Sequence, residues 1–259
     1  MTIDNLLGQS THPDILILSG DIADKGAADS YQRVRATIAQ CPFPVHVMTG
    51  NHDDRRALLK AFPECPTFDD ATGKRYAQYS LDVKGLRVVC LDTLKHGRHG
   101  GALCEARANW LAAQLAAHPV TPTLIVMHHP PVIAGLDWMD PRPHEAWLQR
   151  FGAAIKGHKQ VIGIACGHLH RPVAASFDAT PVSITPAVAP AVSLDLRPVN
   201  FSKADGRGIV DAEPPGYALH RWKDGQLVTH FQPVGDWTRL ATFEDHLVPM
   251  MEALEAEKS

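Results

Sequence analysis

The ten residues PVHVMTGNHD, 44–53, join an apolar run of strand length to a cluster of polar side chains. The run suits a buried β-strand, and Gly50 then permits a tight turn. The same arrangement recurs in ILILSGD (15–21), LIVMHHPP (124–131) and VIGIACGHLH (161–170). In layered α/β folds, ligands bind in the loops that follow the carboxyl ends of strands. The four stretches therefore predict a site at which Asp, Asn and His side chains meet at one edge of a sheet.

Strand and helix patterns alternate along the rest of the chain, as in α/β folds. We expect strands over residues 14–19, 44–49, 76–81, 86–91, 122–127 and 160–166. Apolar residues at helical spacing predict helices over 28–40, 54–62, 105–117 and 143–155. Short strands follow at 173–177, 182–184, 217–222 and 227–231, with a long loop over 195–215 and a terminal helix or tail over 244–258. This order predicts one domain, with a core over residues 1–185 and a β-rich extension and tail over 186–259.

Composition narrows the class of protein. The 259 residues, 45% of them apolar, suffice for one domain with a substantial core. A formal net charge of -3 gives no electrostatic reason to expect a nucleic acid or an anionic membrane as partner. The apolar runs are far shorter than a membrane span, so we expect a cytoplasmic protein. The five cysteines form no CxxC pair, which favours free thiols over a disulfide framework or a zinc knuckle.

The polar clusters contain the ligand types of a hydrolytic metal site. Asp and Asn oxygens with His nitrogens, and no thiolate, suit Mn, Fe, Zn or Co. A carboxylate such as Asp21 can bridge two cations about 3.5–4 Å apart, the separation found in two-metal hydrolases. Two such cations hold a hydroxide nucleophile and neutralise the charge that develops on a phosphoryl group. The clusters thus favour phosphoester hydrolysis.

The order of the clusters also carries a family resemblance. GDIAD (20–24), GNHD (50–53), HHPP (128–131) and GHLH (167–170) resemble successive blocks of the calcineurin-like metallophosphoesterase signature. Within that superfamily the chain is most similar to bacterial class III cyclic-nucleotide phosphodiesterases and glycerophosphodiesterases, which the segments Asp54-Arg55 and WMDP (138–141) support. The resemblance implies a four-layer αββα sandwich. It also implies hydrolysis of a small phosphodiester by a metal-activated hydroxide.

The same resemblance assigns metal ligands in a centre with two divalent cations. Asp21 resembles the bridging carboxylate. Asn51, His128 and His168 resemble the other ligands of one cation, and His170 resembles a ligand of the second. The residue after His128, His129, is the second choice at that ligand position.

Catalytic roles follow from the resemblance as well. His52 resembles the histidine that stabilises the transition state or protonates the leaving alkoxide. Asn51 and His52 are expected to meet the charge that develops on the phosphoryl oxygens. Asp24 is expected to support the turn that carries Asp21. Many relatives have a histidine near the substrate where this sequence has Pro190, a difference that bears on the substrate more than on the metal chemistry.

One block of the family signature is missing. The signature normally opens with Asp-x-His on a first strand, and this sequence contains no Asp-x-His. Residues 1–12 resemble the helix that precedes the next strand, so the opening strand is expected to be absent. Either the reading frame begins upstream of Met1 or the protein is a truncated member. In the second case the cation held by His170 lacks two ligands and the sheet lacks a central strand.

Other polar residues have simpler explanations. His96 and His99 could reach the site from a loop, but composition favours a solvated turn. Asp137 and Asp140 either line a substrate cap or cap a helix.

Several functions agree with these residues. The resemblance favours a 3′,5′-cyclic nucleotide as substrate, then small glycerophosphodiesters, then phosphomonoesters. The competing class is a degenerate relative that binds one metal, or a nucleotide, without turnover. A nuclease is disfavoured by the acidic balance and the lack of a basic stripe. We expect a small-molecule substrate. The oligomeric state stays open, with a homodimer as one possibility because dimers are common among the relatives that the chain resembles.

Overall fold

A six-stranded sheet forms the centre of the computed structural model, which describes residues 2–258. Its strands lie in the order β5 (Tyr79–Val83), β6 (Leu86–Leu91), β7 (Thr123–Met127), β8 (Val161–Cys166), β10 (Thr180–Ile184) and β9 (Val173–Phe177). The four central strands run parallel, and β5 and β9 pair antiparallel at the edges. Every residue of β6 and β7 is buried, as expected for parallel strands that are covered on both faces.

A thinner strand layer covers one face of this sheet. In it, β1 (Leu16–Leu18) pairs in parallel with β2 (Val45–Val47), and β13 (Gly216–Lys223) pairs antiparallel with β14 (Gln226–Pro233). Among the described strands, β1 and β2 pair only with each other. Trp222 and Leu227 of the hairpin pack against the buried residues Val126 and Ala165 of the large sheet. A Cβ atom on Gly163 would lie 2.9 Å from Cδ2 of Leu227, so this glycine lets the hairpin approach the sheet closely.

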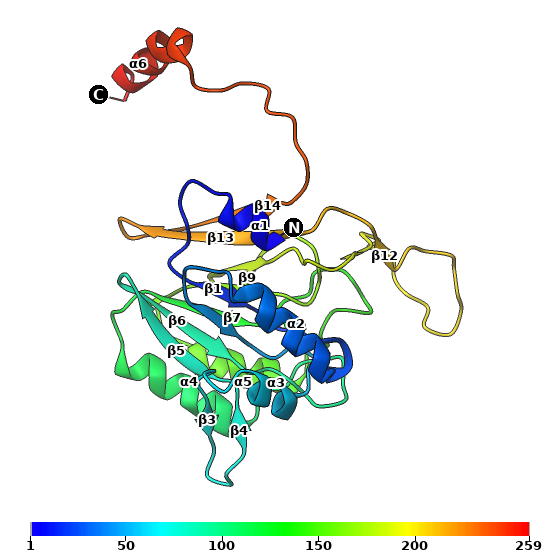
Figure 1. The fold of residues 1–259 in the computed structure, drawn as a ribbon. Coiled ribbons are helices and arrows are strands. Elements are labelled where there is room, and N and C mark those ends of the chain that lie inside the picture. Colours follow the sequence, from blue (N-terminus) through cyan, green and yellow to red (C-terminus); the bar gives the residue numbers. More distant parts are fainter. Residues whose placement is uncertain (1, 259) are drawn as a thin grey trace.

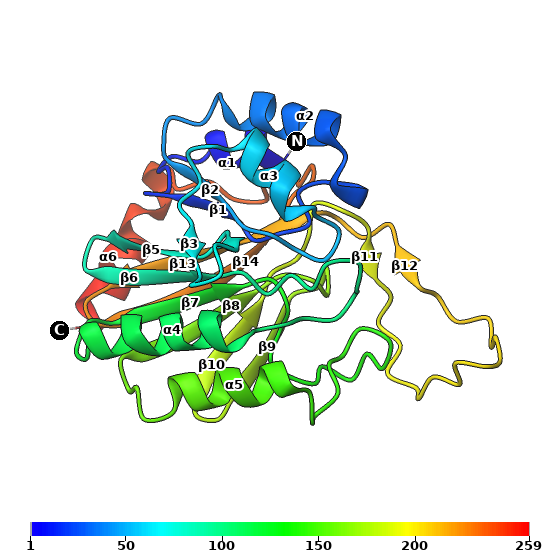
Figure 2. The ribbon, with the colours of Figure 1, turned by 90° about the horizontal axis from the view of Figure 1, so that it is seen from below.

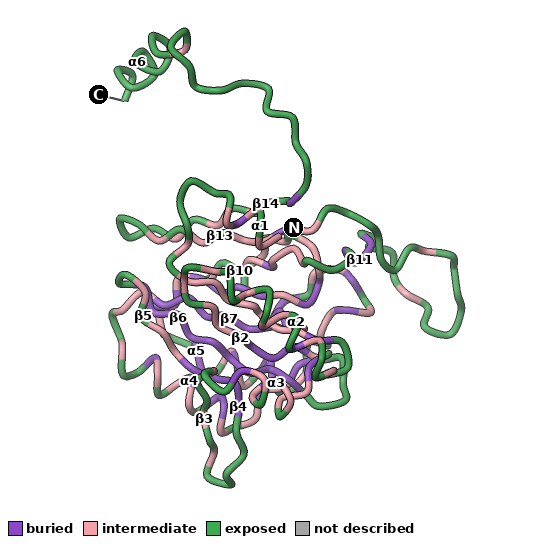
Figure 3. The backbone as a smooth tube through the Cα atoms, viewed as in Figure 1, coloured by how far each residue is buried: buried purple, intermediate pink, exposed green. Residues whose placement is uncertain are grey.

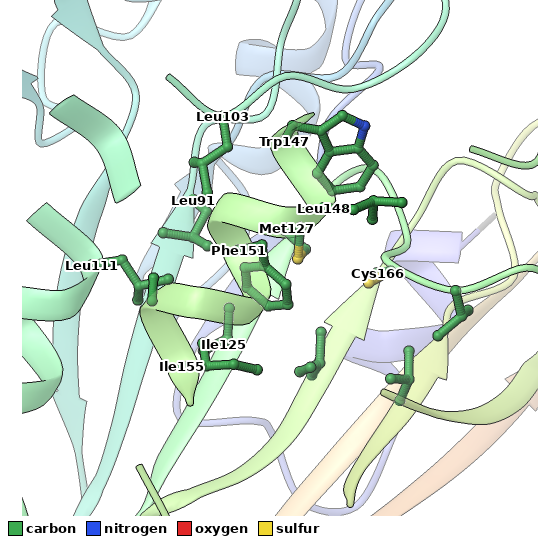
Figure 4. Packing of buried hydrophobic residues seen from close by; sticks show 14 of the residues in the cluster. Leu91, Leu103, Leu111, Ile125, Met127, Trp147, Leu148, Phe151, Ile155 and Cys166 are labelled. Atoms are coloured by element: carbon green, nitrogen blue, oxygen red, sulfur yellow. The ribbon is translucent and has the colours of Figure 1, made fainter. Parts of the chain in front are cut away.

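Helices cover both outer faces (Figures 1 and 2). α2 (Ala28–Ile38) and α3 (Arg55–Ala61) lie over β1 and β2 and bury Tyr31 and Leu58. α4 (Glu105–Ala117) and α5 (Ala146–Ile155) cover the large sheet, and Figure 4 shows Leu111, Ile125 and Phe151 within one buried apolar cluster. The layers therefore follow the order helix, strand, strand, helix. The α/β fold expected from the sequence is confirmed.

Short elements complete the chain. They are α1 (Thr2–Leu7), β3 (Phe68–Asp69), β4 (Arg75–Tyr76), β11 (Ala191–Val192), β12 (Val210–Asp211), α6 (Val248–Ala256) and 3-10 turns over Asp24–Gly26 and Asp245–Leu247. α6 and the segment before it are almost entirely exposed and stand apart from the sandwich (Figures 1 and 3). Within residues 2–258, no helix has both the length and the hydrophobicity that crossing a membrane requires.

The expected elements are largely confirmed, with β6, α4 and β9 matching to the residue. The strand expected over 76–81 is interrupted, because the N–H of Ala77 donates to Oδ2 of Asp92 at 3.0 Å and the backbone leaves the ladder there. The long loop expected over 195–215 contains β12, which pairs with β11, and neither was expected. α6 begins at Val248 rather than near 244, with a proline in its first turn. The boundary expected at residue 185 stays a prediction.

Candidate metal centre

Four loops meet between the carboxyl ends of the two strand layers. The loops after β1 and β2 carry Asp21 and Asn51, and those after β7 and β8 carry His128 and His168. The layers touch directly, since Nδ1 of His128 lies 2.8 Å from the carbonyl oxygen of Ser19. We expected these side chains at the edge of one sheet, but they come from two. The reason is that β1 and β2 form a sheet separate from β7 and β8 in the described part of the chain.

Two glycines make this close approach possible. Gly20 has a φ of +101°, and a Cβ atom on it would lie 2.5 Å from Nδ1 of His128. A Cβ atom on Gly50 would lie 2.1 Å from Oδ1 of Asp21. A side chain at either position would push a polar group of the site aside. The glycine of Gly20-Asp21 and that of GNHD are therefore required by packing against the neighbouring loop.

Asp53 fastens the first two loops together. Its buried carboxylate accepts hydrogen bonds from the backbone N–H groups of Gly50 (2.8 Å), Ala23 (3.0 Å) and Ile22 (3.2 Å). The hydroxyl of Tyr31 donates a fourth, at 3.0 Å. The sequence alone gives no sign of this role of Asp53, because nothing in GNHD distinguishes a turn residue from one that accepts four hydrogen bonds.

Asp21, Asn51 and His128 form the centre of the site. Nε2 of His128 lies 3.1 Å from Oδ2 of Asp21 and 3.2 Å from Oδ1 of Asn51. The backbone N–H of His52 donates to Oδ1 of Asp21 at 2.9 Å. Burial raises the pKa of Asp21, but His128 and the N–H of His52 outweigh burial and lower it. Burial alone would lower the pKa of His128, yet Asp21 raises it, so the two side chains form an ion pair.

A compact group of imidazoles lies beside this pair. Nitrogen atoms of His128, His129 and His168 lie within 4.8 Å of one another, and all three residues are buried. Burial and neighbouring imidazoles lower the pKa of His129 and His168 well below the usual value, so both rings are neutral. Within residues 2–258, neither ring nitrogen of His168 has a hydrogen-bond partner. A buried neutral imidazole beside His128, which itself contacts a carboxylate and an amide oxygen, fits a divalent cation.

His129 has another task. Its Nδ1 lies 2.8 Å from the hydroxyl of Thr93, and its Nε2 lies 3.1 Å from the carbonyl oxygen of His99. A neutral ring satisfies both contacts, with Nε2–H donating to the carbonyl and Nδ1 accepting from the hydroxyl. Both nitrogens of His129 face groups other than the expected ligands, whereas Nε2 of His128 faces Asp21 and Asn51, so the geometry favours His128 over His129 as a ligand.

His52 lies at the exposed side of the centre. Its Nδ1 is 2.9 Å from Oδ1 of Asp24, which fixes the orientation of the ring and leaves Nε2 free. Asp24 was expected to support the turn that carries Asp21. Its carboxylate also contacts His52.

His170 lies at the rim. Its Nδ1 is 2.9 Å from the carbonyl oxygen of Pro190, and it does not belong to the group formed by His128, His129 and His168. His168 and His170 both have positive φ values, +71° and +54°, which His adopts more readily than bulkier residues.

His99 enters the site from an exposed loop. Its Nδ1 lies 3.4 Å from Nδ2 of Asn51, and its ring centroid lies 4.7 Å from that of His168. Composition favoured a solvated turn here; His99 does lie in an exposed bend, and its ring also contacts Asn51. The sequence sign of this approach is Gly100-Gly101. A Cβ atom on Gly101 would lie 3.0 Å from the Cβ of His129, so the glycine lets the loop that carries His99 lie against the site. His96 remains exposed, as expected.

A hollow of about 240 Å³ opens next to His99 and His168. Trp138, Glu145 and Phe201 are among the residues that line it. Asp137 and Asp140 also line it and cap no helix: Asp137 accepts from the N–H of Val199, and Asp140 accepts from those of Ala134 and Gly135.

The sequence matches the family model described as "Calcineurin-like phosphoesterase" over residues 2–172. The chain belongs to the calcineurin-like phosphoesterases. Enzymes of this family hydrolyse phosphoesters with the help of divalent metal ions. The resemblance that the four clusters suggested, and the expectation of a hydrolytic enzyme, are therefore confirmed.

Relatives within the phosphoesterases carry names of two kinds. The chain is 31% identical over 224 residues to the probable glycerophosphodiester phosphodiesterase GpdQ of Arcobacter nitrofigilis, covering 86% of this chain and 79% of the relative. It is 34% identical over 228 residues to a probable cyclic nucleotide phosphodiesterase of Rhodopseudomonas palustris, covering 85% and 78%. Among solved structures, a putative 5′-nucleotidase from Staphylococcus aureus aligns with a TM-score of 0.51 at 13% identity, over 98% of this chain and 51% of that one. At this low identity, the similarity to the solved structure shows only that the two chains share a fold.

In this phosphoesterase, Asp21 and Asn51 both contact His128, and the ring of His168 lies beside that of His128, with 5.2 Å between centroids. The fifth expected metal ligand, His170, lies at the rim. The roles of these five residues as ligands stay predictions, as do the catalytic roles of Asn51 and His52.

Proposed function

We propose that the protein hydrolyses a small phosphodiester, with a 3′,5′-cyclic nucleotide as first choice and a glycerophosphodiester as the alternative. The contact of His128 with both Asp21 and Asn51 carries the proposal, because it gathers an imidazole, a carboxylate and an amide between two sheets. Relatives named for both kinds of substrate support the class. The net charge of -3 supports a small molecule over a nucleic acid, and a cytoplasmic location is part of the proposal.

Asp21, Asn51, His128 and His168 would hold one divalent cation (Mn, Fe, Zn or Co), and Asp21 with His170 would contribute to a second. When bound, such cations supply Lewis acidity and lower the pKa of water, the nucleophile of hydrolysis. His168 and Asp21 already have the protonation states that this requires, whereas His128, ion-paired with Asp21, would give up its proton to the solvent. Burial keeps His168 neutral, and the lowered pKa of Asp21 keeps its carboxylate ionised.

His52 and Asn51 would act on the phosphoryl group. Because Asp24 fixes Nδ1 of His52, the free Nε2 can donate a proton to the leaving oxygen. The amide nitrogen of Asn51 can donate a hydrogen bond to a phosphoryl oxygen as charge develops there.

Metal content and turnover, measured on one preparation, test the proposal. The chain is loaded with Mn²⁺, freed of excess ion, and assayed with bis(p-nitrophenyl) phosphate, cyclic AMP and glycerophosphocholine. We expect bound metal by elemental analysis, hydrolysis of the nitrophenyl diester, and a higher kcat/KM for cyclic AMP than for glycerophosphocholine. The reverse order would move the assignment to glycerophosphodiesters. Metal-loaded, folded protein that turns over none of the three would contradict the proposal.

A second candidate is a relative that binds one metal, or a nucleotide, without turnover. The separation of His170 from the group formed by His128, His129 and His168 favours this candidate, because the second cation would then have few ligands among the assigned residues. One metal per chain together with nucleotide binding and no hydrolysis would select it.

A further inference from the structure

The hollow beside the metal centre is suited to one substituent of a diester. Its volume of about 240 Å³ lies just below the ~300–1,000 Å³ of pockets that enclose drug-sized ligands. It therefore suits a single ring system or a short chain. His129 and His168 line the hollow and also belong to the imidazole group of the centre. A substituent on a phosphoryl group bound at the centre would enter it directly.

Trp138 provides a flat apolar face in this hollow. Its ring stacks beside that of His99, with 6.5 Å between centroids and 19° between planes. The segment that carries Trp138 is fixed, because Asp140 accepts hydrogen bonds from the N–H groups of Ala134 (2.9 Å) and Gly135 (2.8 Å). His99 in turn contacts Asn51. His99 therefore connects the indole of Trp138 to Asn51, one of the residues of the proposed phosphoryl site.

The carboxylates around the hollow are already engaged. Glu145 accepts from the backbone N–H of Arg142 and from the indole N–H of Trp147, both at 2.8 Å. Asp137 accepts from the N–H of Val199 at 2.9 Å. With Asp140 bound to its own turn, all three carboxylates are held in place by hydrogen bonds from the chain, and each keeps further acceptor capacity. The flat ring of Trp138 lies in the same lining.

A quaternary ammonium group such as choline fits less well. Cages for such cations surround the charge with several aromatic faces. Trp147 is only 4% exposed and packs in the main apolar cluster, so its face is not open to a ligand. By charge the lining is mixed, since Arg142 lies with the carboxylates of Asp137, Asp140 and Glu145. Trp138 and the exposed Phe201 offer fewer faces than such a cage, whereas one flat face is enough for a stacked planar ring.

We propose that Trp138 stacks on the nucleobase of the substrate and so selects nucleotides over phosphoesters that lack a base. The inference rests on the proposed function, because it places the base relative to the same phosphoryl site. In this role Trp138 determines specificity and takes no part in bond cleavage.

Two ligands that differ only by the base test this directly. Calorimetry on the Mn²⁺-loaded protein compares 5′-AMP with ribose 5-phosphate. We expect AMP to bind roughly tenfold tighter, the order of one base stacked on an aromatic ring. Trp138→Ala should bind both ligands equally, and Trp138→Phe should retain most of the preference. Trp237→Ala is the matched control, since Trp237 is 62% exposed outside the site and its removal should leave the preference intact.

The outcomes separate the inference from the function on which it rests. Turnover of cyclic AMP without a Trp138-dependent preference for AMP would overturn the inference and leave the function standing. If the wild-type protein prefers AMP, loses that preference in Trp138→Ala and hydrolyses no cyclic AMP, the inference stands and the proposed function is wrong. If Trp138→Ala weakens glycerophosphocholine but leaves the AMP preference unchanged, the hollow takes a cation and the inference is wrong. Trp138→Phe keeps the test valid if the alanine variant does not fold.

Discussion

Oδ2 of Asp21 lies 3.1 Å from Nε2 of His128, and this ion pair spans the two strand layers of the sandwich. Asp21 follows β1 in the thin layer, and His128 follows β7 in the large sheet. The pair explains why Asp21 keeps its charge in a largely buried position: His128 lowers its pKa despite burial. A cation bound at this point would replace the proton on His128.

Removal of the Asp21 carboxylate should abolish activity and leave the fold in place. We expect Asp21→Ala to lose more than the roughly 10–100-fold that changes outside the ligand sphere cost, and to retain less metal after dialysis. Turnover of bis(p-nitrophenyl) phosphate, elemental analysis and circular dichroism give the three readouts. Asp14→Ala, which removes an exposed ion pair with Lys84, is the control and should behave as wild type. Full turnover in metal-loaded Asp21→Ala would refute the assignment.

A methyl group on Gly20 should disturb both the backbone and His128. Gly20→Ala combines a φ of +101° with a Cβ atom 2.5 Å from Nδ1 of His128, so we expect a loss of about 3 kcal/mol of stability and reduced metal binding. Gly73→Ala separates the two effects, since its φ is +78° but nothing lies within 4 Å of the added atom. It should cost only about 1 kcal/mol by urea denaturation. Equal losses in the two variants would argue against the close approach.

The carboxylate of Asp53 should contribute strongly to stability. Asp53→Asn leaves one oxygen for four donors and turns an NH₂ group toward the others, so we expect a loss of about 2–4 kcal/mol. Tyr31→Phe removes one of these donors and should cost about 1–2 kcal/mol. Urea denaturation with unchanged m-values measures both. A wild-type midpoint for Asp53→Asn would show that the two loops do not depend on this residue.

Asp24 should act through His52. Asp24→Ala frees the ring of His52, so we expect kcat to fall by roughly tenfold while the number of bound metal ions stays constant. Asp29→Ala, which breaks an exposed helix ion pair with Arg33, is the matched control. If the double variant Asp24→Ala/His52→Ala has the same kcat as His52→Ala alone, the effect of Asp24 passes through His52. Additive losses would assign Asp24 a separate role.

Cys104 should be the most reactive thiol at neutral pH. Burial raises its pKa, but hydrogen bonds from the backbone of Arg107, the hydroxyl of Tyr76 and the guanidinium of Arg107 outweigh burial and lower the pKa to about 7. Burial instead raises the pKa of Cys65 and Cys90 to about 12. Because the thiolate is the nucleophile, alkylation of Cys104 by iodoacetamide should increase through pH 7 and level off by about pH 8. Peptide mass spectrometry after short labelling checks this, and a midpoint near the ordinary thiol pKa would contradict it.

The sequence predicted the parts of the fold that local pattern controls. The apolar runs before Gly20, Gly50, His128 and Gly167 form strands, because a strand buried on both faces needs little more than a continuous apolar run. The polar residues that follow meet because the loops after β1 and β2 in one layer contact those after β7 and β8 in the other. The family signature then identified which of these residues to examine.

Contacts between distant segments could not be predicted in this way. The break at Ala77 depends on the carboxylate of Asp92 just after β6, and the contact of His99 with Asn51 depends on a loop held by His129. The four donors to Asp53 come from three separate segments. Neither residue spacing nor composition records such pairs.

Because the proposed ligands are divided between two sheets, a bound cation would act as a cross-link between them. Unfolding separates Asp21 and Asn51 from His128 and His168, so the ion must leave when the layers part. Each further tenfold excess of free metal over its dissociation constant would then add about 1.4 kcal/mol to the stability of the folded chain. A cell short of metal would therefore lose this protein to proteolysis as well as lose its activity, and the amount of the protein would follow the metal supply.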